Sequence, residues 1–558
     1  MTDTRNSRMK TRWMITNGLA GLKERLDQKL PSVTAGIGGA FTPALLFVII
    51  LVIGIFARVW QFGEVPPGLN QDEASIGVEA YDLYHFGVDR NGFSYPVEFL
   101  SWGNGMDALE GYVLIPFMTL GLNPVTVRLP ILISGILTLL LVFFVAKRSF
   151  GLTVGLLSMF LLAISPWHIL MSRWGINENI LPFVFMLGFA CLILTTPKNQ
   201  WFIGAMIFFG LTLYAYGAMY VAMPVFLILA IPLMVYAKRV STKTLISGLL
   251  LFAIVITPIL ICIVINIFGW NTIEIGKITI PHLLGTARFL SVSATSSSNP
   301  IKSMIYNASI MFKLLLINQS DGLIFNSVGQ FGYLYPFSFP LAVLGVGLLF
   351  PYRKTKLIPE KMLVLAWLLA ALCIGLFLNA QFNRIQLVFI PIILCTAAFL
   401  DWLGRQHRVL LALMVCIYLV SFFSFNKNYH GIEYYKDATH NFYPGLIPAL
   451  QYASQQGEHP ICVTNLVTDP YIYVLLAEPE NPSSYLNTIE YTNPNEGFRE
   501  VRTLSRYIFG LDSCREDPKM IYVLYYEKIP DTLKNYLKKD FTDFHVYIPP
   551  SDQISTKP

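Results

Sequence analysis

Two adjacent carboxylates, Asp72 and Glu73, lie just beyond the first long apolar segment of the 558-residue chain. An ionised carboxylate beside a membrane face is suited to take a proton from a hydroxyl group, as a general base does. The structural alternative is that Asp72 is only the N-cap of a helix and that the helix dipole favours Glu73. The two interpretations are compatible, because a capping carboxylate is fixed in direction. The dipeptide therefore marks this loop as a candidate catalytic site.

The composition predicts an integral membrane protein, with 54% hydrophobic and only 13% charged residues. Long stretches without charged residues recur, and a helix of about 20 apolar residues crosses the hydrocarbon core of a bilayer. We predict an all-α polytopic membrane fold with about eleven transmembrane helices, near 41–60, 127–146, 152–171, 179–196, 201–216, 220–236, 245–268, 334–351, 361–379, 385–402 and 409–425.

Cationic residues cluster in alternate loops, and this pattern predicts the orientation in the cell membrane. If the N-terminal segment 1–40 is cytoplasmic, the loops at Lys147, Lys198, Lys238, Lys354 and Arg405 are cytoplasmic too. The transmembrane domain is then 41–425, with outer loops at 61–126 and 270–333, and the tail 426–558 is extracytoplasmic. The net charge of +6 comes from these scattered loop residues, so we expect no nucleic-acid partner.

The tail differs in composition from the rest of the chain and predicts a small external α/β domain. Short β-type runs occur at 461–467, 471–476, 520–526 and 544–548. Five of the seven cysteines fall in apolar segments, where a thiol is usually a small core residue. Cys462 and Cys514 fall in the tail and are the candidate disulfide pair.

In the first outer loop, Pro66-Pro67-Gly68 predicts a turn before Asp72. Ile76, Ala80, Leu83 and Tyr84 then repeat at helical spacing. The loop therefore predicts a short amphipathic helix on the outer membrane face.

A set of short motifs surrounds and follows this helix, in this order: Asn70 to Gly77 with Ala80-Tyr81, Gly87 to Gly92, Val127-Arg128-Leu129-Pro130, Ser165-Pro166-Trp167-His168 with Ser172-Arg173, Tyr214-Ala215-Tyr216 and Asn383-Arg384. The ordered set resembles the bacterial membrane glycosyltransferases of the C type that are related to the protein O-mannosyltransferases and to the aminoarabinose transferase of lipid A. The resemblance covers roughly residues 41–425. One stretch departs from the family pattern, since Gly105 to Tyr112 replaces a His- or Lys-Pro-Pro-Leu-Tyr run.

The resemblance implies inverting transfer of a sugar from a polyprenyl-phosphate donor to an acceptor hydroxyl on a protein, a lipid or a cell-wall glycan. Asp72 matches the base, and Glu73 the neighbour that orients an acceptor or tunes that base. Cations should stabilise the leaving phosphate. We expect Arg128 first in this role, together with Arg173, His168 and Arg384. The alternative for each is a residue that anchors a helix end at the membrane interface, with Glu178 paired to Arg173.

The sequence contains no metal-binding motif, and we expect no obligatory cofactor. Asp72 with Glu73 can hold Mg²⁺ or Mn²⁺ beside a phosphate, so a divalent metal remains an alternative. Two other functions also remain open. One is a non-catalytic transporter or flippase of lipid-linked or polymeric substrate, although acidic residues within the predicted spans are nearly absent. The other is a sensor or assembly protein that binds glycan.

Overall fold

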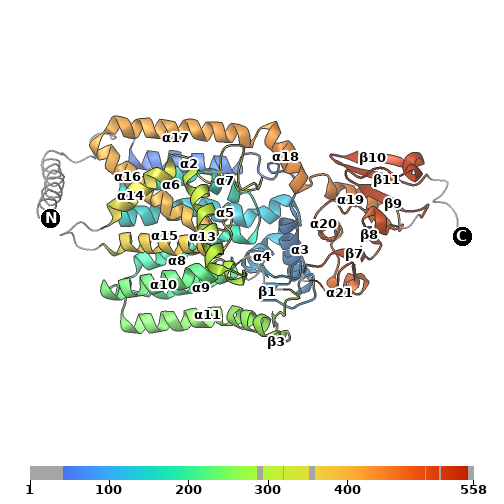
Figure 1. Ribbon diagram of the computed structural model, residues 1–558, viewed down its shortest axis with the longest axis horizontal. Helices are drawn as coiled ribbons and strands as arrows, with labels where there is room; N and C mark the ends of the chain where they lie inside the picture. Colours follow the sequence, from blue (N-terminus) through green and yellow to red (C-terminus); the bar gives the residue numbers. More distant parts are fainter. Residues whose placement is uncertain are drawn as a thin grey trace, which may run out of the picture.

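The structure is a computed structural model that describes residues 42–550, except 286–292, 318–319, 351–357, 495, 497 and 515–516. The predicted cytoplasmic segment 1–40 and the cationic loop at Lys354 lie outside the described residues. An elongated helical bundle forms one end of the molecule, and a smaller sheet-containing domain forms the other (Figure 1).

All eleven segments predicted to cross the membrane are helical. The segment predicted at 152–171 consists of two helices, because Ser165 and Pro166 interrupt it. Eight helices of the described part are long and apolar enough to span a membrane, and several of the others are shorter apolar helices. The bundle contains α2 (Pro43–Val59), α5 (Pro124–Phe150), α6 (Leu152–Ala163), α7 (Pro166–Met171), α8 (Leu181–Leu194), α9 (Trp201–Leu211), α10 (Met219–Tyr236), α11 (Thr242–Phe268), α14 (Ser338–Leu349), α15 (Pro359–Phe377), α16 (Phe389–Gln406) and α17 (Arg408–Tyr429).

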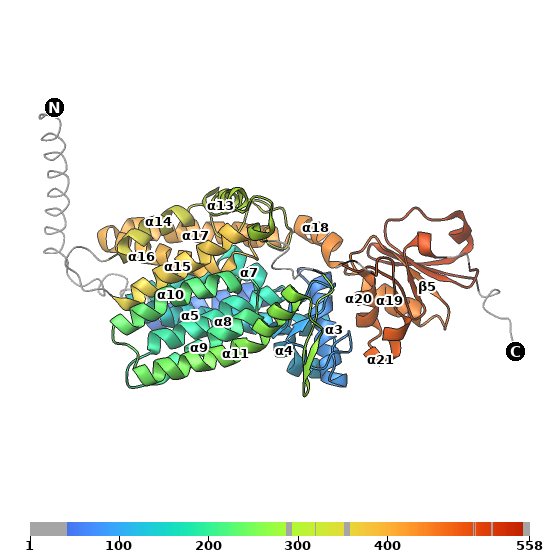
Figure 2. The same cartoon turned by 60° about the horizontal axis from the view of Figure 1, so that its bottom comes forward.

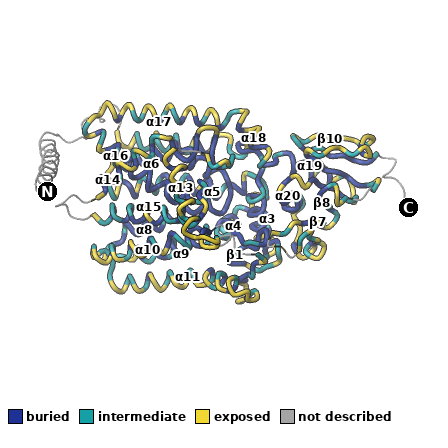
Figure 3. Tube along the Cα trace, viewed as in Figure 1, coloured by how far each residue is buried: buried dark blue, intermediate teal, exposed yellow. Residues whose placement is uncertain are grey.

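The outward faces of the bundle are apolar as well as its interior. Large side chains on α11 and α17 are exposed along the length of each helix (Figure 3), among them Ile254, Val420 and Phe423. Such a surface is favourable only against lipid, because exposed apolar patches of this extent are rare on soluble proteins. The chain is therefore a multi-pass membrane protein, as predicted.

The segment predicted as the second outer loop contains a long helix that the sequence analysis missed, α13 (Pro300–Ile317). It is apolar enough to span a membrane. However, Ser293 before it pairs with Leu378, and Asp321 after it accepts a hydrogen bond of 2.9 Å from the Phe382 amide. Both ends of α13 thus lie at the same end of α15, so α13 does not cross the bundle. Figure 2 shows it along the edge of the bundle.

The first outer loop folds into α3 (Gln71–Phe86), the hairpin of β1 (Glu98–Phe99) and β2 (Met106–Asp107), α4 (Leu109–Leu114) and the 3₁₀ helix η2 (Ile115–Leu120). The predicted helix therefore exists, but its N-cap is Asn70 and not Asp72. It packs between the bundle and the C-terminal domain (Figure 1), where Ile76, Ala80 and Leu83 are buried and Tyr84 is exposed.

The C-terminal domain contains a mixed seven-stranded sheet in the order β10-β11-β9-β5-β8-β7-β6. Cys462 in the central strand β5 is bonded to Cys514, which confirms the predicted disulfide. The strands are β5 (Ile461–Val463), β6 (Glu490–Tyr491), β7 (Val501–Leu504), β8 (Tyr507–Phe509), β9 (Ile521–Leu524), β10 (Leu537–Phe541) and β11 (Phe544–Ile548), and the helices are α18 (Ile432–Phe442), α19 (Leu446–Ser454), α20 (Pro470–Ala477) and α21 (Pro482–Tyr485).

The prediction of a strand at 471–476 is wrong, since these residues form part of α20. Pro470 starts the helix, and all its residues from Tyr471 to Leu476 are buried against α3 and α19. Burial on every side overrides the β propensity of tyrosine, isoleucine and valine. Together, α3, the outer-loop residues after it and the C-terminal domain share one hydrophobic core. The tail is thus packed onto the loop that carries Asp72.

Candidate active site

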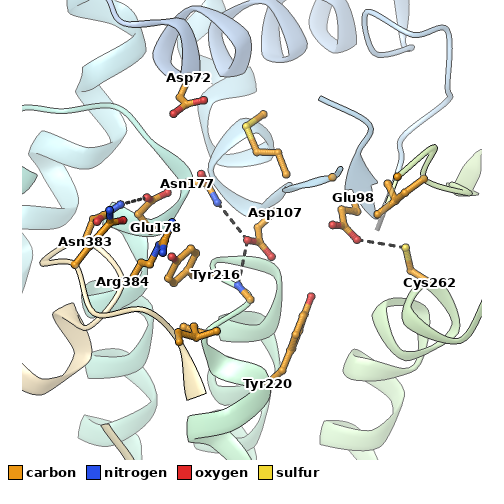
Figure 4. Close-up of a pocket in the computed structure, with 18 of the residues that line it drawn as sticks. Asp72, Glu98, Asp107, Asn177, Glu178, Tyr216, Tyr220, Cys262, Asn383 and Arg384 are labelled. Atoms are coloured by element: carbon orange, nitrogen blue, oxygen red, sulfur yellow. Dashed lines mark hydrogen bonds between the residues drawn. The ribbon is translucent and has the colours of Figure 1, made fainter. Parts of the chain in front are cut away.

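A cavity of about 730 Å³ opens at the end of the bundle, below the outer loop. Segments that are distant in sequence line it (Figure 4), and both polar and apolar side chains contribute to the lining. The polar residues that define it are Asp72, Glu98, Asp107, Asn177, Glu178, Tyr216, Tyr220, Cys262, Asn266, His282, Asn383 and Arg384.

Asp72 lies in the first turn of α3 and its carboxylate lines this cavity (Figure 4). The turn is fixed by a capping box, in which the Asn70 side chain accepts from the Glu73 amide at 2.9 Å and the Glu73 side chain accepts from the Asn70 amide at 3.2 Å. The indole Nε1 of Trp102 donates to Asp72 Oδ1 at 3.4 Å. The position of Asp72 therefore suits the predicted base.

Glu73 points away from the cavity and is fully buried. Its two carboxylate oxygens accept from Arg128 Nε at 2.6 Å and Nη2 at 2.8 Å. The Gly175 amide adds a third hydrogen bond, of 2.8 Å. With Asn70 as a further donor, the carboxylate is occupied by the protein itself. Asp72 and Glu73 thus do not face the cavity as a pair.

Arg128 is fully buried and does not line the cavity. Besides Glu73, its guanidinium donates to the carbonyl oxygens of Pro66 at 2.8 Å and Gly68 at 2.7 Å. These contacts hold the turn before α3, and they use the planar fork that was expected to grip a phosphate. Arg128 therefore supports the loop that carries Asp72.

Arg173 and His168 also lie outside the cavity. Arg173 is fully buried and donates to four backbone carbonyl oxygens between residues 58 and 65, at 2.7–3.1 Å. His168 Nδ1 lies 2.7 Å from a guanidinium nitrogen of Arg58, another buried arginine. The expected single basic pocket is therefore absent from the described residues. Arg173 and His168 instead bind the end of α2 and the residues after it to the bundle.

Arg384 is the one predicted phosphate contact that does line the cavity. Its hydrogen bond to the Asn379 carbonyl is long, at 3.4 Å, and the side chain is partly exposed. The neighbouring Asn383 donates to Glu178 Oε1 at 2.8 Å. Glu178 thus contacts Asn383, where the sequence suggested Arg173. This side of the cavity carries a guanidinium close to an amide and a carboxylate.

The opposite side of the cavity carries two carboxylates that the sequence analysis did not select, Glu98 and Asp107. Asp107 Oδ2 accepts from Asn177 Nδ2 at 3.2 Å and from the Gly217 amide at 3.1 Å. Glu98 Oε2 lies 3.4 Å from Cys262 Sγ. Burial and the nearby Asp107 raise the pKa of Glu98 to about 8. In the sequence, the only feature that pointed to this part of the chain was the departure of the 105–112 stretch, which contains Asp107, from the family pattern.

The electrostatic character of the cavity thus differs from the basic pocket that was expected. Four carboxylates line it, from Asp72, Glu98, Asp107 and Glu178, beside Arg384. Among the described residues, no three His, Cys, Asp or Glu side chains are grouped so that they could hold one metal ion.

The fold of the chain is similar to that of a solved membrane protein. The structure is similar to ArnT from Cupriavidus metallidurans bound to undecaprenyl phosphate, with a TM-score of 0.54 and 12% identity over 94% of this chain and 100% of that one. The apo state of the same protein gives a TM-score of 0.53 and 13% identity over 92% and 99%. These matches show the fold.

A family model matches part of the sequence. Residues 110–262 match the model of the family described as dolichyl-phosphate-mannose-protein mannosyltransferase. The comparison with curated proteins gave no match. The matched segment begins within α4 and ends in α11, so it includes five polar residues of the cavity, Asn177, Glu178, Tyr216, Tyr220 and Cys262.

Proposed function

We propose that this protein is an inverting glycosyltransferase that moves a sugar from a polyprenyl-phosphate donor to an acceptor hydroxyl at the outer face of the cell membrane. The observation that carries the proposal is the Asp72 carboxylate opening into the same cavity as Arg384. The glycosyltransferase fold and the mannosyltransferase family match support it. That ArnT binds undecaprenyl phosphate supports the same class of donor.

In this reaction the acceptor oxygen forms a bond to the anomeric carbon, and the bond from that carbon to the phosphate oxygen breaks. Asp72 takes the proton of the acceptor hydroxyl, which makes the oxygen a better nucleophile. The lipid phosphate leaves with an additional negative charge, which Arg384 is placed to stabilise. Glu73, Arg128, Arg173 and His168 act on the shape of the loop, through the contacts described above.

The outer-face assignment is supported by charge and by cysteine chemistry. At the ends of α5, α10 and α16 that are distant from the cavity, Lys147 and Arg405 lie in the last turns of α5 and α16, and Arg239 follows α10. The Cys462–Cys514 disulfide lies at the cavity end, and disulfides persist in oxidising compartments outside the cytoplasm. Both observations favour a cytoplasmic N-terminus and an extracytoplasmic C-terminal domain.

The test is release of polyprenyl phosphate by the purified protein from a panel of polyprenyl-phosphate sugars, with candidate acceptors present. We expect release with at least one donor, and Asp72→Asn should lower the rate by about 10²–10⁴-fold because the base is lost. Asp531→Asn makes the same chemical change on a side chain that is 90% exposed and serves as the control.

A rate near that of the wild type in well-folded Asp72→Asn would refute the assignment of the base. Movement of lipid-linked substrate across vesicles without phosphate release would favour the transporter alternative.

A further inference from the structure

Trp102 connects the proposed base to the C-terminal domain. The indole is buried, with 6% of its surface exposed, and its Nε1 donates to Asp72 Oδ1 at 3.4 Å. On its other side, the ring meets Tyr471 edge-on with 6.1 Å between ring centroids, and Phe498 lies 6.4 Å away. The Trp102 carbonyl oxygen accepts from the Arg499 amide at 3.2 Å. Three residues of the C-terminal domain therefore contact the residue that contacts Asp72.

A buried arginine holds the plane of the same indole. The Arg90 guanidinium lies 4.7 Å from the centroid of Trp102 and 5.8 Å from that of Tyr471. Its Nη1 donates to Ser75 at 2.7 Å and its Nε lies 3.2 Å from Glu79 Oε1, so it is anchored on α3. The indole is thus fixed by α3 on one side and by α20 on the other.

We infer that Trp102 is a positioning residue for Asp72, and that the C-terminal domain acts on the reaction by holding Trp102. The inference rests on the proposed function. In this arrangement Trp102 occupies Oδ1 of Asp72, and the proton of the acceptor hydroxyl goes to Oδ2. The C-terminal domain is then part of the catalytic machinery, although neither Tyr471 nor Phe498 lines the cavity.

Asp72 needs a positioning residue because its carboxylate is free to rotate. Asp72 is in the first turn of α3 and faces a cavity, so protein packing does not confine it on that side. A general base works only within about 2.6–3.2 Å of the proton that it takes. A misplacement of about 1 Å can reduce a rate by about 100-fold. One directed hydrogen bond from a buried indole selects the direction of the carboxylate.

The test uses steady-state kinetics of the full-length protein with the donor that the wild type accepts. Trp102→Phe keeps an aromatic ring for Tyr471 and Arg90 to pack on but removes the N–H. We expect kcat to fall by about 10–100-fold while the KM for the donor changes less than twofold, because Trp102 does not line the cavity. Trp402→Phe makes the same change at a half-exposed position on α16 and is the control.

A double-mutant cycle then tests the link to the C-terminal domain. Tyr471→Leu removes the ring that meets the indole, and we expect it to lower kcat by about 3–30-fold. In the Trp102→Phe background the same change should have almost no further effect, because its influence passes through the indole N–H. If Tyr471→Leu does not fold, Phe498→Leu replaces it, since Phe498 is half exposed and contacts the same ring.

A wild-type kcat in folded Trp102→Phe would overturn the inference, and so would independent, multiplicative losses in the double variant. Either result leaves the proposed function intact as long as the wild type releases lipid phosphate in an Asp72-dependent manner. Failure of the wild type to use any donor would instead refute the proposed function.

Discussion

Asp72 and Glu73 are adjacent in the chain, yet they have different surroundings and different tasks. Successive residues of an α-helix point about 100° apart, because there are 3.6 residues per turn. Asp72 therefore faces the cavity, while Glu73 faces the bundle and pairs with Arg128. The second carboxylate of the dipeptide stabilises the loop that presents the first.

The buried pair of Glu73 and Arg128 gives a prediction at the residue scale. Arg128→Ala leaves Glu73 buried without its cation, so we expect a loss of about 3–5 kcal/mol in the free energy of unfolding. Arg128→Lys keeps the charge but cannot contact Glu73, Pro66 and Gly68 together, so a smaller loss is expected. The donor KM of the protein that remains folded should not change. Thermal unfolding and donor kinetics measure the two effects.

Arg384→Lys is the matched control, because Arg384 lines the cavity and has only one long hydrogen bond. It should raise the donor KM and leave the unfolding temperature unchanged. A raised donor KM in Arg128→Lys at an unchanged unfolding temperature would return Arg128 to the role of phosphate ligand.

Asp72 and Arg384, which were selected from motifs whose order resembles a family, both line the cavity. The sequence was less informative for buried cations. An arginine at the end of an apolar segment has the same sequence pattern whether it binds a phosphate or a neighbouring carbonyl. Arg128 and Arg173 bind neighbouring carbonyl oxygens. These partners, at residues 58–68, become neighbours of the two arginines only in the folded bundle. Asp107 was missed for the corresponding reason, since Asn177 and Gly217 are distant in sequence.

At the scale of elements, α3 carries an unusual buried face. Three carboxylates gather around Arg90, from Glu79 and Asp82 in the helix and Asp89 just after it, and all are buried. Burial, together with the charges of Glu79 and Asp89, raises the pKa of Asp82 to about 9. Asp82 is therefore protonated in the folded protein at neutral pH.

This raised pKa predicts a pH-dependent stability. The unfolded chain releases the Asp82 proton above about pH 4, whereas the folded protein keeps it up to about pH 9. The folded state binds more protons in this window, so the contribution of Asp82 to stability falls as the pH rises. Asp82→Asn carries no charge at any pH, so it should be more stable than the wild type by a margin that widens from pH 5 to pH 8.5.

The measurement is the unfolding temperature of both proteins across that range. Asp531→Asn, at an exposed position, should follow the wild type at every pH. A difference between Asp82→Asn and the wild type that does not vary with pH would contradict the assignment of the proton to Asp82.

The bundle helices, α13 and α20 show which elements can be predicted from the sequence. The bundle helices were found because an apolar run of about 20 residues has few alternatives. The α20 and α13 segments were misassigned because each is apolar for a reason that the local pattern does not contain. Tyr471 to Leu476 is buried by α3 and α19, and α13 packs on α15 without crossing the bundle. In both cases the neighbour that decides the structure is distant in the chain.

For the whole molecule, the main question is which face of the membrane the cavity opens on. With the N-terminus cytoplasmic, the C-terminal domain is outside and the α10–α11 connection is inside. A membrane-impermeant thiol reagent added to intact cells should therefore label a cysteine placed at Glu480, which is exposed. A cysteine placed at Lys238, also exposed, should be labelled only after the cells are permeabilised.

The unmodified protein gives the background, since its exposed Cys416 lies within α17. Labelling of position 238 in intact cells would reverse the orientation and contradict transfer at the outer face.

The packing of the tail onto the catalytic loop also has a consequence for the biosynthesis of this protein. The Tyr473 hydroxyl donates to the Leu69 carbonyl oxygen, a contact between residues 404 positions apart. A ribosome makes Asp72 early, but Trp102 obtains Tyr471, Phe498 and Arg499 only when nearly the whole chain has been translated and its end translocated. A nascent or prematurely terminated chain thus lacks the contacts that hold Trp102 beside Asp72. Under the proposed role of Trp102, full transfer activity is therefore expected only after this last part of the chain has been made and folded.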